Sequence, residues 1–537
     1  MKKTDVQTAS GPTRRQMLQI GGGFGLALAL PLGPGAMAQE GTSLRIAVPS
    51  DLSGWDHDYV AFDTVALSVM KNVYPFMIDY GVREVDGGRV GDTETVVPLY
   101  AESWTSNEDG TVWTLRLRQG ILFPSGNELT AHDVKWSKDR AFAAQANVAG
   151  IYRIIGLTEA DQVKVIDDYT VEFTQSTPSA LTSQIQIISL YVYDSELLQE
   201  NATEDDPWAQ AYVNQTPQDG GAYNVSEYRP GEEIVLTANP NFPGEPPAVQ
   251  TISLQVVPAP ANRRLLLQNG DVDIALGLAR RDAQDMAGVE GLTLLSSPNN
   301  EFVFVPMNMA MAPFDNAGVR KALAMAVPYE ALIRSVYNGD ARPLKSPVPI
   351  DMPGHSEIGY PFAYDVEAAT AALAEAGYPD GFETSIVITS GDVDAERIAV
   401  LLQASFAAIG VTLEIETVDP ATLQQRRRDR TVPLQVAAGQ MWVNDVEYLL
   451  AVALTEGGFL NYANYSSDVV NGILASLQGE LDTDTRMALI TEAQEQLAED
   501  VPWLCLAQPN FVLPISDRVG GWVQPVDGLF RLRYLTA

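Results

Sequence analysis

The chain has 537 residues, and 69 acidic residues against 34 basic ones give it a formal net charge of −35. Such an excess of negative charge disfavours nucleic acid and anionic membranes as partners, because it repels phosphates. The length allows about three compact units at roughly 100–200 residues each, and a single cysteine, Cys505, excludes an internal disulfide. We interpret the charge as a source of solubility, with a cationic ligand as the alternative.

The first 38 residues have the pattern of an export signal. The pair Arg14-Arg15 precedes an apolar, glycine-rich core at 20–32, which is shorter than the roughly 20 residues of a membrane span. The small-x-small sequence Ala36-Met37-Ala38 predicts cleavage before Gln39, leaving 499 residues with a charge of −38. The arginine pair predicts export by the twin-arginine route. No cysteine lies at the cleavage point, which excludes a lipid anchor there.

A strand, a polar loop and a helix are predicted next. Thr42–Val48 alternates as a strand does, Asp51–Asp63 is polar and aromatic, and Phe62–Tyr74 has the spacing of a helix. In α/β folds, a loop at the carboxyl end of a strand is where ligand groups lie. Three residues of this loop are therefore candidate ligand contacts: Trp55, Asp56 and His57. The alternative for Trp55 is packing against the rest of its own domain.

The region from 97 to 173 has clear local signals. Thr111–Leu117 alternates like a half-buried strand. Thr130 is suited to cap a helix, with Asp133 completing a variant of the capping box. The stretch Val163–Phe173 predicts a hairpin in which two aspartates form the turn.

The middle of the chain predicts a buried strand followed by two helices. Phe302–Met309 is almost wholly apolar, as in a strand that is buried on both faces. Asp315 or Asn316 can cap the first helix. Pro328 suits the first turn of the second helix, and Gly339 its end. We expect the chain to leave one lobe and enter another at 303–309.

Several motifs in fixed order resemble one known family. They include LYAESW at 99–104 followed by WTLRLRQGILF and LTAHDVKWS, GGAYNVSEYRPGEEIVLTANP at 220–240, FDNAGVRKALAMA at 314–326 and LAEAGYP at 373–379. In the second of these, Gly221 and Ala222 depart from the family pattern. Together the motifs resemble the extracytoplasmic solute-binding proteins of ABC transporters, family 5, of the dipeptide-, oligopeptide- and nickel-binding type. The resemblance covers nearly the whole chain after the leader.

This resemblance implies an α/β fold, the type II two-lobed periplasmic binding protein with a subdomain inserted in lobe I. The implied ranges are lobe I at 44–75, 218–301 and 508–537, the insertion at 76–217, lobe II at 302–507 and the leader at 1–38. It further implies a periplasmic monomer that binds a peptide or amino-acid-like solute and delivers it to an ABC permease and, through that, to the ATPase subunits. A metal chelate, a sugar or opine-like solute, and a ligand-sensing role are the alternatives.

A W-x-x-D element is the sharpest candidate binding motif. In peptide binders of this family its Asp contacts the ligand ammonium, and Trp442 and Asp445 keep that spacing. Removing such a buried partner is expected to cost about 3 kcal/mol, about 100-fold in affinity. Glu447 is the substitute if the alignment slips, and a solvent-facing carboxylate is the alternative. Tyr462 is a candidate for lining the cleft.

No constellation in the sequence predicts an enzyme or a resident cofactor. The three histidines, His57, His132 and His355, are far apart, and no H-E-x-x-H, P-loop or G-x-S-x-G motif occurs. An exported hydrolase is therefore the least favoured class. The basic run 426–430 is interpreted as a solvated face, with an acidic ligand group or the permease as the alternatives.

Overall fold

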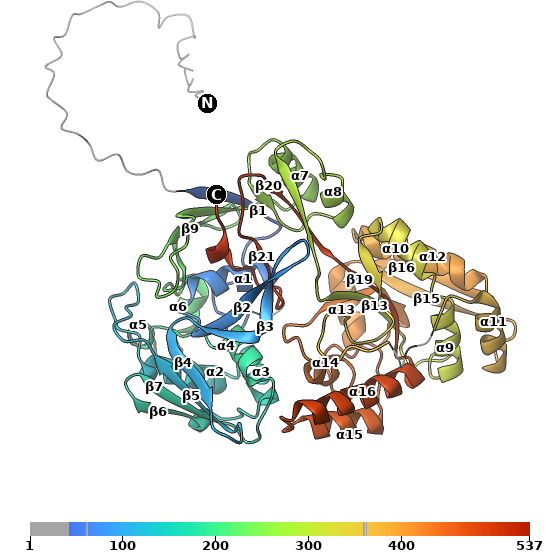
Figure 1. The fold of residues 1–537 in the computed structure, drawn as a ribbon, viewed down its shortest axis with the longest axis horizontal. Coiled ribbons are helices and arrows are strands. Elements are labelled where there is room, and N and C mark those ends of the chain that lie inside the picture. The colour runs from blue at the N-terminus through green and yellow to red at the C-terminus, as the bar shows by residue number, and fades with distance from the viewer. Residues whose placement is uncertain (1–41, 61–62, 358–359, 361) are drawn as a thin grey trace, which may run out of the picture. The chain divides into compact units, whose positions relative to one another are not determined.

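The computed structural model describes residues 42–60, 63–357, 360 and 362–537. The predicted leader at 1–38 lies outside the described residues. The described residues belong to one compact unit, and Figure 1 shows it as a mixed α/β structure with several separate sheets.

The largest sheet has seven strands and is centred on the first strand of the chain. β1 (Ser43–Val48) was expected from its alternation, and it pairs in parallel with β10 on one side and with β11 on the other. The order across the sheet is β12 (Leu292–Ser297), β20 (Phe511–Ser516), β11 (Ile274–Ala275), β1, β10 (Thr251–Val256), β9 (Glu233–Ala238) and β8 (Tyr223–Arg229).

A four-stranded sheet and a three-stranded sheet are built from the second half of the chain. The first has the order β14 (Ala341–Pro343), β19 (Trp503–Pro509), β13 (Glu301–Pro306) and β18 (Ala437–Gln440). The second has the order β16 (Val411–Val418), β15 (Phe382–Thr389) and β17 (Leu434–Gln435). β13 confirms the predicted buried strand, although it ends at Pro306 rather than at Met309.

The chain crosses between the seven-stranded and the four-stranded sheet at two neighbouring points. It passes from β12 to β13 through residues 298–300, a few residues earlier than expected, and it returns from β19 to β20 through Asn510. β13 and β19 are paired antiparallel, and so are β12 and β20. In Figure 1 the two crossings therefore run side by side.

Two smaller sheets come mainly from residues 78–174. One has the order β4 (Ala101–Ser106), β5 (Val112–Leu117), β7 (Thr170–Thr174) and β6 (Val163–Asp167), which confirms the predicted strand and hairpin. The other joins β2 (Ile78–Val85) and β3 (Gly88–Pro98) to β21 (Val523–Gln524).

The helices begin where the sequence places their caps. Thr130 and Asp133 form the predicted capping box of α2, and Asn316 caps α9. Pro328 directly precedes α10, and Asn338, in the left-handed conformation, ends it before Gly339. Phe62, the predicted start of α1, lies outside the described residues. The helices are α1 Thr64–Val73, α2 Ala131–Ala143, α3 Asn147–Ile154, α4 Thr182–Ser189, α5 Ser195–Glu200, α6 Gln210–Gln215, α7 Pro260–Gln268, α8 Arg280–Gln284, α9 Ala317–Met325, α10 Tyr329–Tyr337, α11 Val366–Glu375, α12 Val393–Ala407, α13 Pro420–Arg428, α14 Val446–Ala453, α15 Asp468–Leu477 and α16 Thr483–Asp500, with 3-10 turns η1 Ala160–Gln162 and η2 Leu532–Tyr534.

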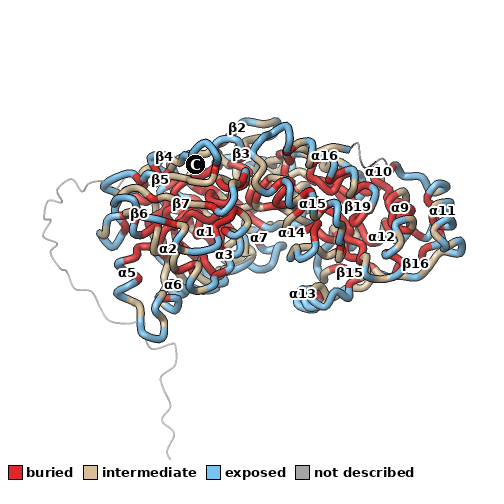
Figure 2. Tube along the Cα trace, turned by 90° about the horizontal axis from the view of Figure 1, so that it is seen from below, coloured by how far each residue is buried: buried red, intermediate tan, exposed pale blue. Residues whose placement is uncertain are grey.

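The buried residues of the molecule lie mainly around its sheets. Figure 2 shows buried residues concentrated in the interior and α13 as an exposed element at the surface. Cys505 is a free, fully buried thiol on β19. Within the part of the chain that is described, no helix has the length and apolar character needed to cross a membrane.

Candidate functional site

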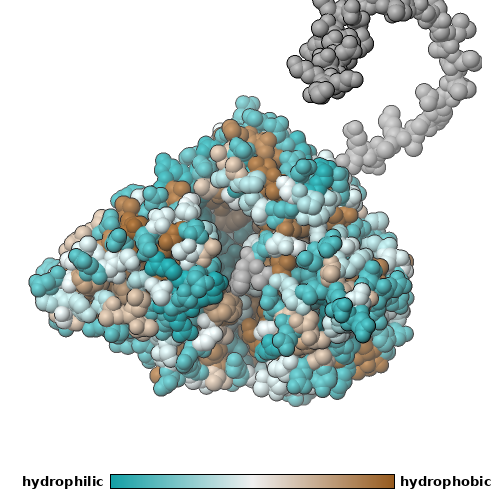
Figure 3. Space-filling model, turned by 180° about the vertical axis from the view of Figure 1, so that it is seen from behind, coloured by the Kyte–Doolittle hydropathy of each residue, from teal (hydrophilic) through white to brown (hydrophobic). Residues whose placement is uncertain are grey.

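A cavity of about 500 Å³ is the main candidate ligand site, and we call it the apolar cavity. Its wall includes side chains of α1, α3 and α4 as well as of α14 and the segment before it. Most of these side chains are apolar, for example Val148, Ile151, Ile188, Tyr448 and Val452. A ligand pocket of this kind is a mostly apolar enclosure with a few polar groups. The face of the molecule in Figure 3 is hollowed by a groove between hydrophilic sides.

His57 is the buried imidazole in the wall of the apolar cavity. It is 7% exposed, and its ring centroid lies 4.0 Å from that of Tyr191. Neither ring nitrogen has a hydrogen-bond partner among the described residues. Burial, together with the charges of Lys71 and Lys138, lowers the pKa of His57 to about 3. The imidazole is therefore neutral at physiological pH.

Asp56 and Asp58, on either side of His57, hold the loop in place through Arg140. The Arg140 guanidinium is fully buried and donates to Asp56 Oδ1 and Oδ2 over 3.0 and 2.6 Å, and it also pairs with Asp58. Arg140 belongs to α2, so the pairs join the loop after β1 to the helical layer. Trp55 is 2% exposed and packs edge-on against Tyr228 at 5.4 Å.

Trp442 also lines the apolar cavity, and it lies just before α14 in the chain. The Asp445 side chain caps α14 by accepting from the Glu447 backbone N–H over 2.8 Å. Arg486 of α16 donates to both Asp445 oxygens, over 3.0 and 3.2 Å, and to Glu447 Oε2 over 2.8 Å. One guanidinium thus serves two carboxylates, and the cluster carries one negative charge in excess when both are ionised.

The surroundings of this cluster raise the pKa of both carboxylates. Burial raises the pKa of Glu447 to about 7, against the effect of Arg486, and burial also raises the pKa of Asp445. Glu447 is 2% exposed, whereas the Asp445 side chain is 19% exposed. Glu447, with a pKa of about 7, is therefore partly protonated at neutral pH.

A second cavity of about 690 Å³ adjoins the first, and we call it the basic cavity. Its wall contains Tyr462 and four arginines, Arg426, Arg427, Arg428 and Arg430. The two cavities share the turn Gly457-Gly458 and the side chain that follows it, Phe459.

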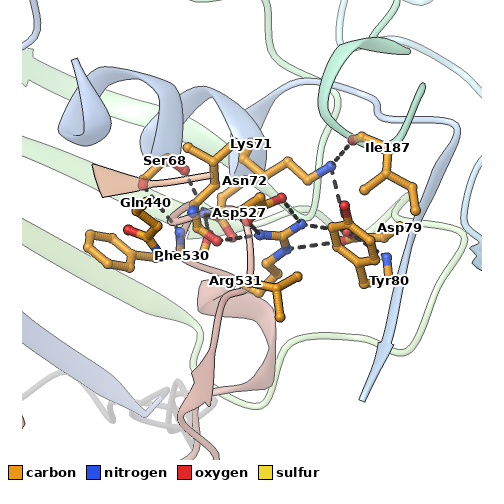
Figure 4. A network of polar contacts seen from close by, with 12 residues as sticks. Ser68, Lys71, Asn72, Asp79, Tyr80, Ile187, Gln440, Asp527, Phe530 and Arg531 are labelled. Atoms are coloured by element: carbon orange, nitrogen blue, oxygen red, sulfur yellow. Dashed lines mark hydrogen bonds and ion pairs between the residues drawn. The ribbon is translucent and has the colours of Figure 1, made fainter. Parts of the chain in front are cut away.

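A buried ionic network positions one more side chain of the apolar cavity (Figure 4). Arg531 donates to Asp79 Oδ1 over 2.8 Å and to Asp527 Oδ2 over 2.7 Å, and it also donates to the Leu529 carbonyl. Lys71 lies 3.6 Å from Asp79 and donates to the Ile187 carbonyl over 2.6 Å. Leu529, in the apolar cavity wall, is thus held through its own backbone.

The pKa values of Asp79 and Lys71 in this network are shifted by neighbouring charges and by burial. Burial alone would raise the pKa of Asp79, but the neighbouring cations Arg531, Lys71 and Arg533 outweigh burial and keep that pKa well below its usual range. The pKa of Lys71 falls to about 7, chiefly through burial.

The structure divides the residues that were predicted to contact a ligand into three groups. His57 and Trp442 line the apolar cavity, and Tyr462 lines the basic cavity. Neither wall contains Trp55, Asp56, Asp445 or Glu447. Asp56 is paired with Arg140, and Asp445 and Glu447 are paired with Arg486.

Several wall residues had no signal in the sequence. Ile151, Tyr448 and Phe459 look like ordinary apolar positions, and only their meeting in space marks them. Among the described residues, no group of three or more His, Cys, Asp or Glu side chains is placed to hold a metal ion.

Comparison with known proteins gives a consistent result. Residues 95–461, more than half of the chain, match the sequence profile of the "Bacterial extracellular solute-binding proteins, family 5 Middle". Heme-binding protein A of Haemophilus influenzae is 27% identical, with 82% of this chain and 83% of that protein covered. The glutathione-binding protein GsiB of Pectobacterium atrosepticum is 25% identical, with 90% and 92% covered.

A solved structure has the same fold. The periplasmic binding protein DppA of Helicobacter pylori, associated with an ABC transporter and solved in complex with the peptide STSA, superposes with a TM-score of 0.78 at 23% identity. The superposition covers 92% of this chain and 98% of that one.

Proposed function

Because the chain belongs to the bacterial extracellular solute-binding proteins of family 5, we propose that it binds a peptide or amino-acid-like solute in the periplasm and delivers it to an ABC importer. The observation that carries this proposal is the apolar cavity, whose wall joins His57 and α3 to Trp442 and α14. A ligand that contacts both halves of the wall would stabilise a closed form, because only that form makes both sets of contacts.

The proposed lobes follow the predicted ranges. All strands of the seven-stranded sheet come from 44–75, 218–301 and 508–537, and the β4–β7 sheet comes wholly from 76–217. The sheets built around β13 and β15 come almost wholly from 302–507. This partition supports two lobes with an insertion in the first.

We assign the solute contacts to His57, Trp442 and Tyr462, and the ligand ammonium to the cluster of Asp445 and Glu447. The cluster has an excess negative charge when Glu447 is ionised, and a ligand ammonium nearby would favour that ionised form. Trp55 and Asp56 take a supporting role, since they fix the loop that carries His57.

Native mass spectrometry of the protein as purified tests the function. We expect a retained mass that matches a small peptide or a related solute. Calorimetric titration with a peptide panel is the second measurement. Absence of a retained mass together with absence of binding to any peptide would refute the proposal.

Asp445→Asn is expected to weaken binding of a peptide with a free ammonium about tenfold. This is less than the 100-fold expected for an unpaired buried carboxylate, because Asp445 is already paired with Arg486 and Glu447 remains. Calorimetry with the free peptide and its N-acetylated form measures this. The acetylated peptide should bind both proteins equally, and Asp484→Asn, an exposed aspartate on α16, is the control variant. Equal affinity of wild type and Asp445→Asn for the free peptide would contradict the role.

Binding is also expected to strengthen as the pH rises from 5.5 to 7. Glu447 has a pKa of about 7, so it is protonated at pH 5.5 and gains negative charge toward pH 7, whereas a peptide ammonium stays charged over this range. The gain should be about tenfold at most. In Glu447→Gln the affinity should be independent of pH, and a slope that persists in this variant would exclude Glu447 as its source.

A further inference from the structure

The basic cavity stands out because the chain as a whole is strongly acidic. With a net charge of −35, this chain gathers four arginines around one cavity. No carboxylate belongs to the described wall, which otherwise consists of amide, aromatic, aliphatic and glycine residues.

Most of the cationic charge in this wall has no acidic partner among the described residues. Arg426 alone is paired, with Glu416 at 2.5 Å. Arg427 donates to the neutral Gln435 over 2.8 Å and lies over the Tyr462 ring, 4.3 Å from its centroid. Arg428 donates to Gln425 over 2.9 Å.

Arg427 is the best placed of these residues to attract an anion. It is half-buried, and burial lowers its pKa, so an anion nearby would offset the cost of desolvating the guanidinium. Arg428 and Arg430 are exposed at the end of α13, the surface element seen in Figure 2. Guanidinium groups present several donors in a planar fork that matches carboxylates.

Two asparagine amides of the wall are already used in shaping it. Asn308 donates to the Arg430 and Val432 carbonyls, each over 3.0 Å, and Asn464 donates to Asn308 over 2.7 Å. Arg427, Arg428 and Arg430 are therefore the cationic groups described in this wall that are available to an acidic ligand.

The apolar cavity begins on the other side of Phe459, which is 58% exposed and belongs to both walls. A single ligand can therefore reach both cavities past this side chain. Resting on the proposed function, we propose that Arg427, Arg428 and Arg430 form an anion-binding compartment that selects peptides with an apolar residue for the first cavity and an acidic side chain for the second.

Calorimetry with pairs of dipeptides and tripeptides tests this proposal. The two peptides of a pair differ only in having Glu or Gln, and each contains Phe or Leu as the apolar residue. We expect the wild type to bind the Glu peptides about tenfold more tightly than the Gln peptides at low ionic strength. The triple variant Arg427→Gln, Arg428→Gln, Arg430→Gln should lose this preference, so that its affinities for the Glu and Gln peptides are equal.

Two further variants keep the test sharp. Arg428→Gln with Arg430→Gln changes only exposed side chains and should lose part of the preference. Arg334→Gln, on the exposed part of α10, should leave the preference unchanged.

The inference would be overturned, and the proposed function left standing, if the wild type bound Glu and Gln peptides with equal affinity. The same would follow if the preference survived in the triple variant. Loss of uptake through the importer with unchanged peptide binding would also overturn it, and would assign the arginines to the permease. Failure of every peptide to bind the wild type would instead refute the proposed function.

Discussion

Replacing Arg531 by methionine is expected to lower the free energy of unfolding by about 3–5 kcal/mol. The guanidinium is 5% exposed and lies between Asp79 and Asp527, which are themselves almost fully buried. Without it, Lys71 and Arg533 still pair with Asp79, but neither of them pairs with Asp527. Urea unfolding followed by tryptophan fluorescence measures the loss, with Arg334→Met as an exposed control.

The stability of the same variant should depend less on pH in the acid range. The depressed pKa of Asp79 contributes stability above the pKa of the unfolded chain, and this stability is lost as the pH falls through the folded value. Without Arg531 the folded pKa rises toward the unfolded value, so the difference in unfolding free energy between wild type and variant should shrink as the pH falls. A loss below 1 kcal/mol at neutral pH, with an unchanged dependence of stability on pH, would show that the remaining cations suffice.

Filling the apolar cavity through Gly150→Trp is expected to reduce solute affinity at least 100-fold, about 3 kcal/mol. Gly150 lies on α3 in the cavity wall, and a Cβ added there meets no heavy atom within 4 Å. An indole at this position therefore enters the space that the solute needs, while the helix gains from the loss of glycine.

Gly472→Trp is a matched control for this change. Gly472 is also an exposed helical glycine with open space around its Cβ, on α15 and outside both cavities. Calorimetry should find wild-type affinity in the control and near-complete loss in Gly150→Trp, at equal thermal stability. Undiminished binding in Gly150→Trp would place the solute elsewhere.

Local patterns predicted the elements of this fold well. Alternation predicted β1 and β5, and the capping box at Thr130 predicted where α2 begins, because both depend on neighbours a few residues away. The short strand β11, two residues long, has no such pattern. Its place beside β1 depends on contacts with residues more than two hundred positions away.

The candidate site could be predicted only in part for the same reason. The W-x-x-D spacing identified Trp442 and Asp445, but Arg486, which takes up the carboxylate, lies 41 residues further along the chain. Likewise, His57 and Asp56 are adjacent in sequence, yet one lines the cavity and the other pairs with Arg140 of α2. Which of two neighbours contacts the ligand space is decided by distant partners.

The position of β20 determines when this protein can finish folding. β20 lies between β11 and β12, so two strands made more than 200 residues earlier wait for residues 511–516 near the end of the chain. Forming such a pairing closes a long loop and is slow. The growing polypeptide therefore has an incomplete largest sheet until synthesis is almost finished, and during this time chaperones can protect the open edges of β11 and β12 from aggregation.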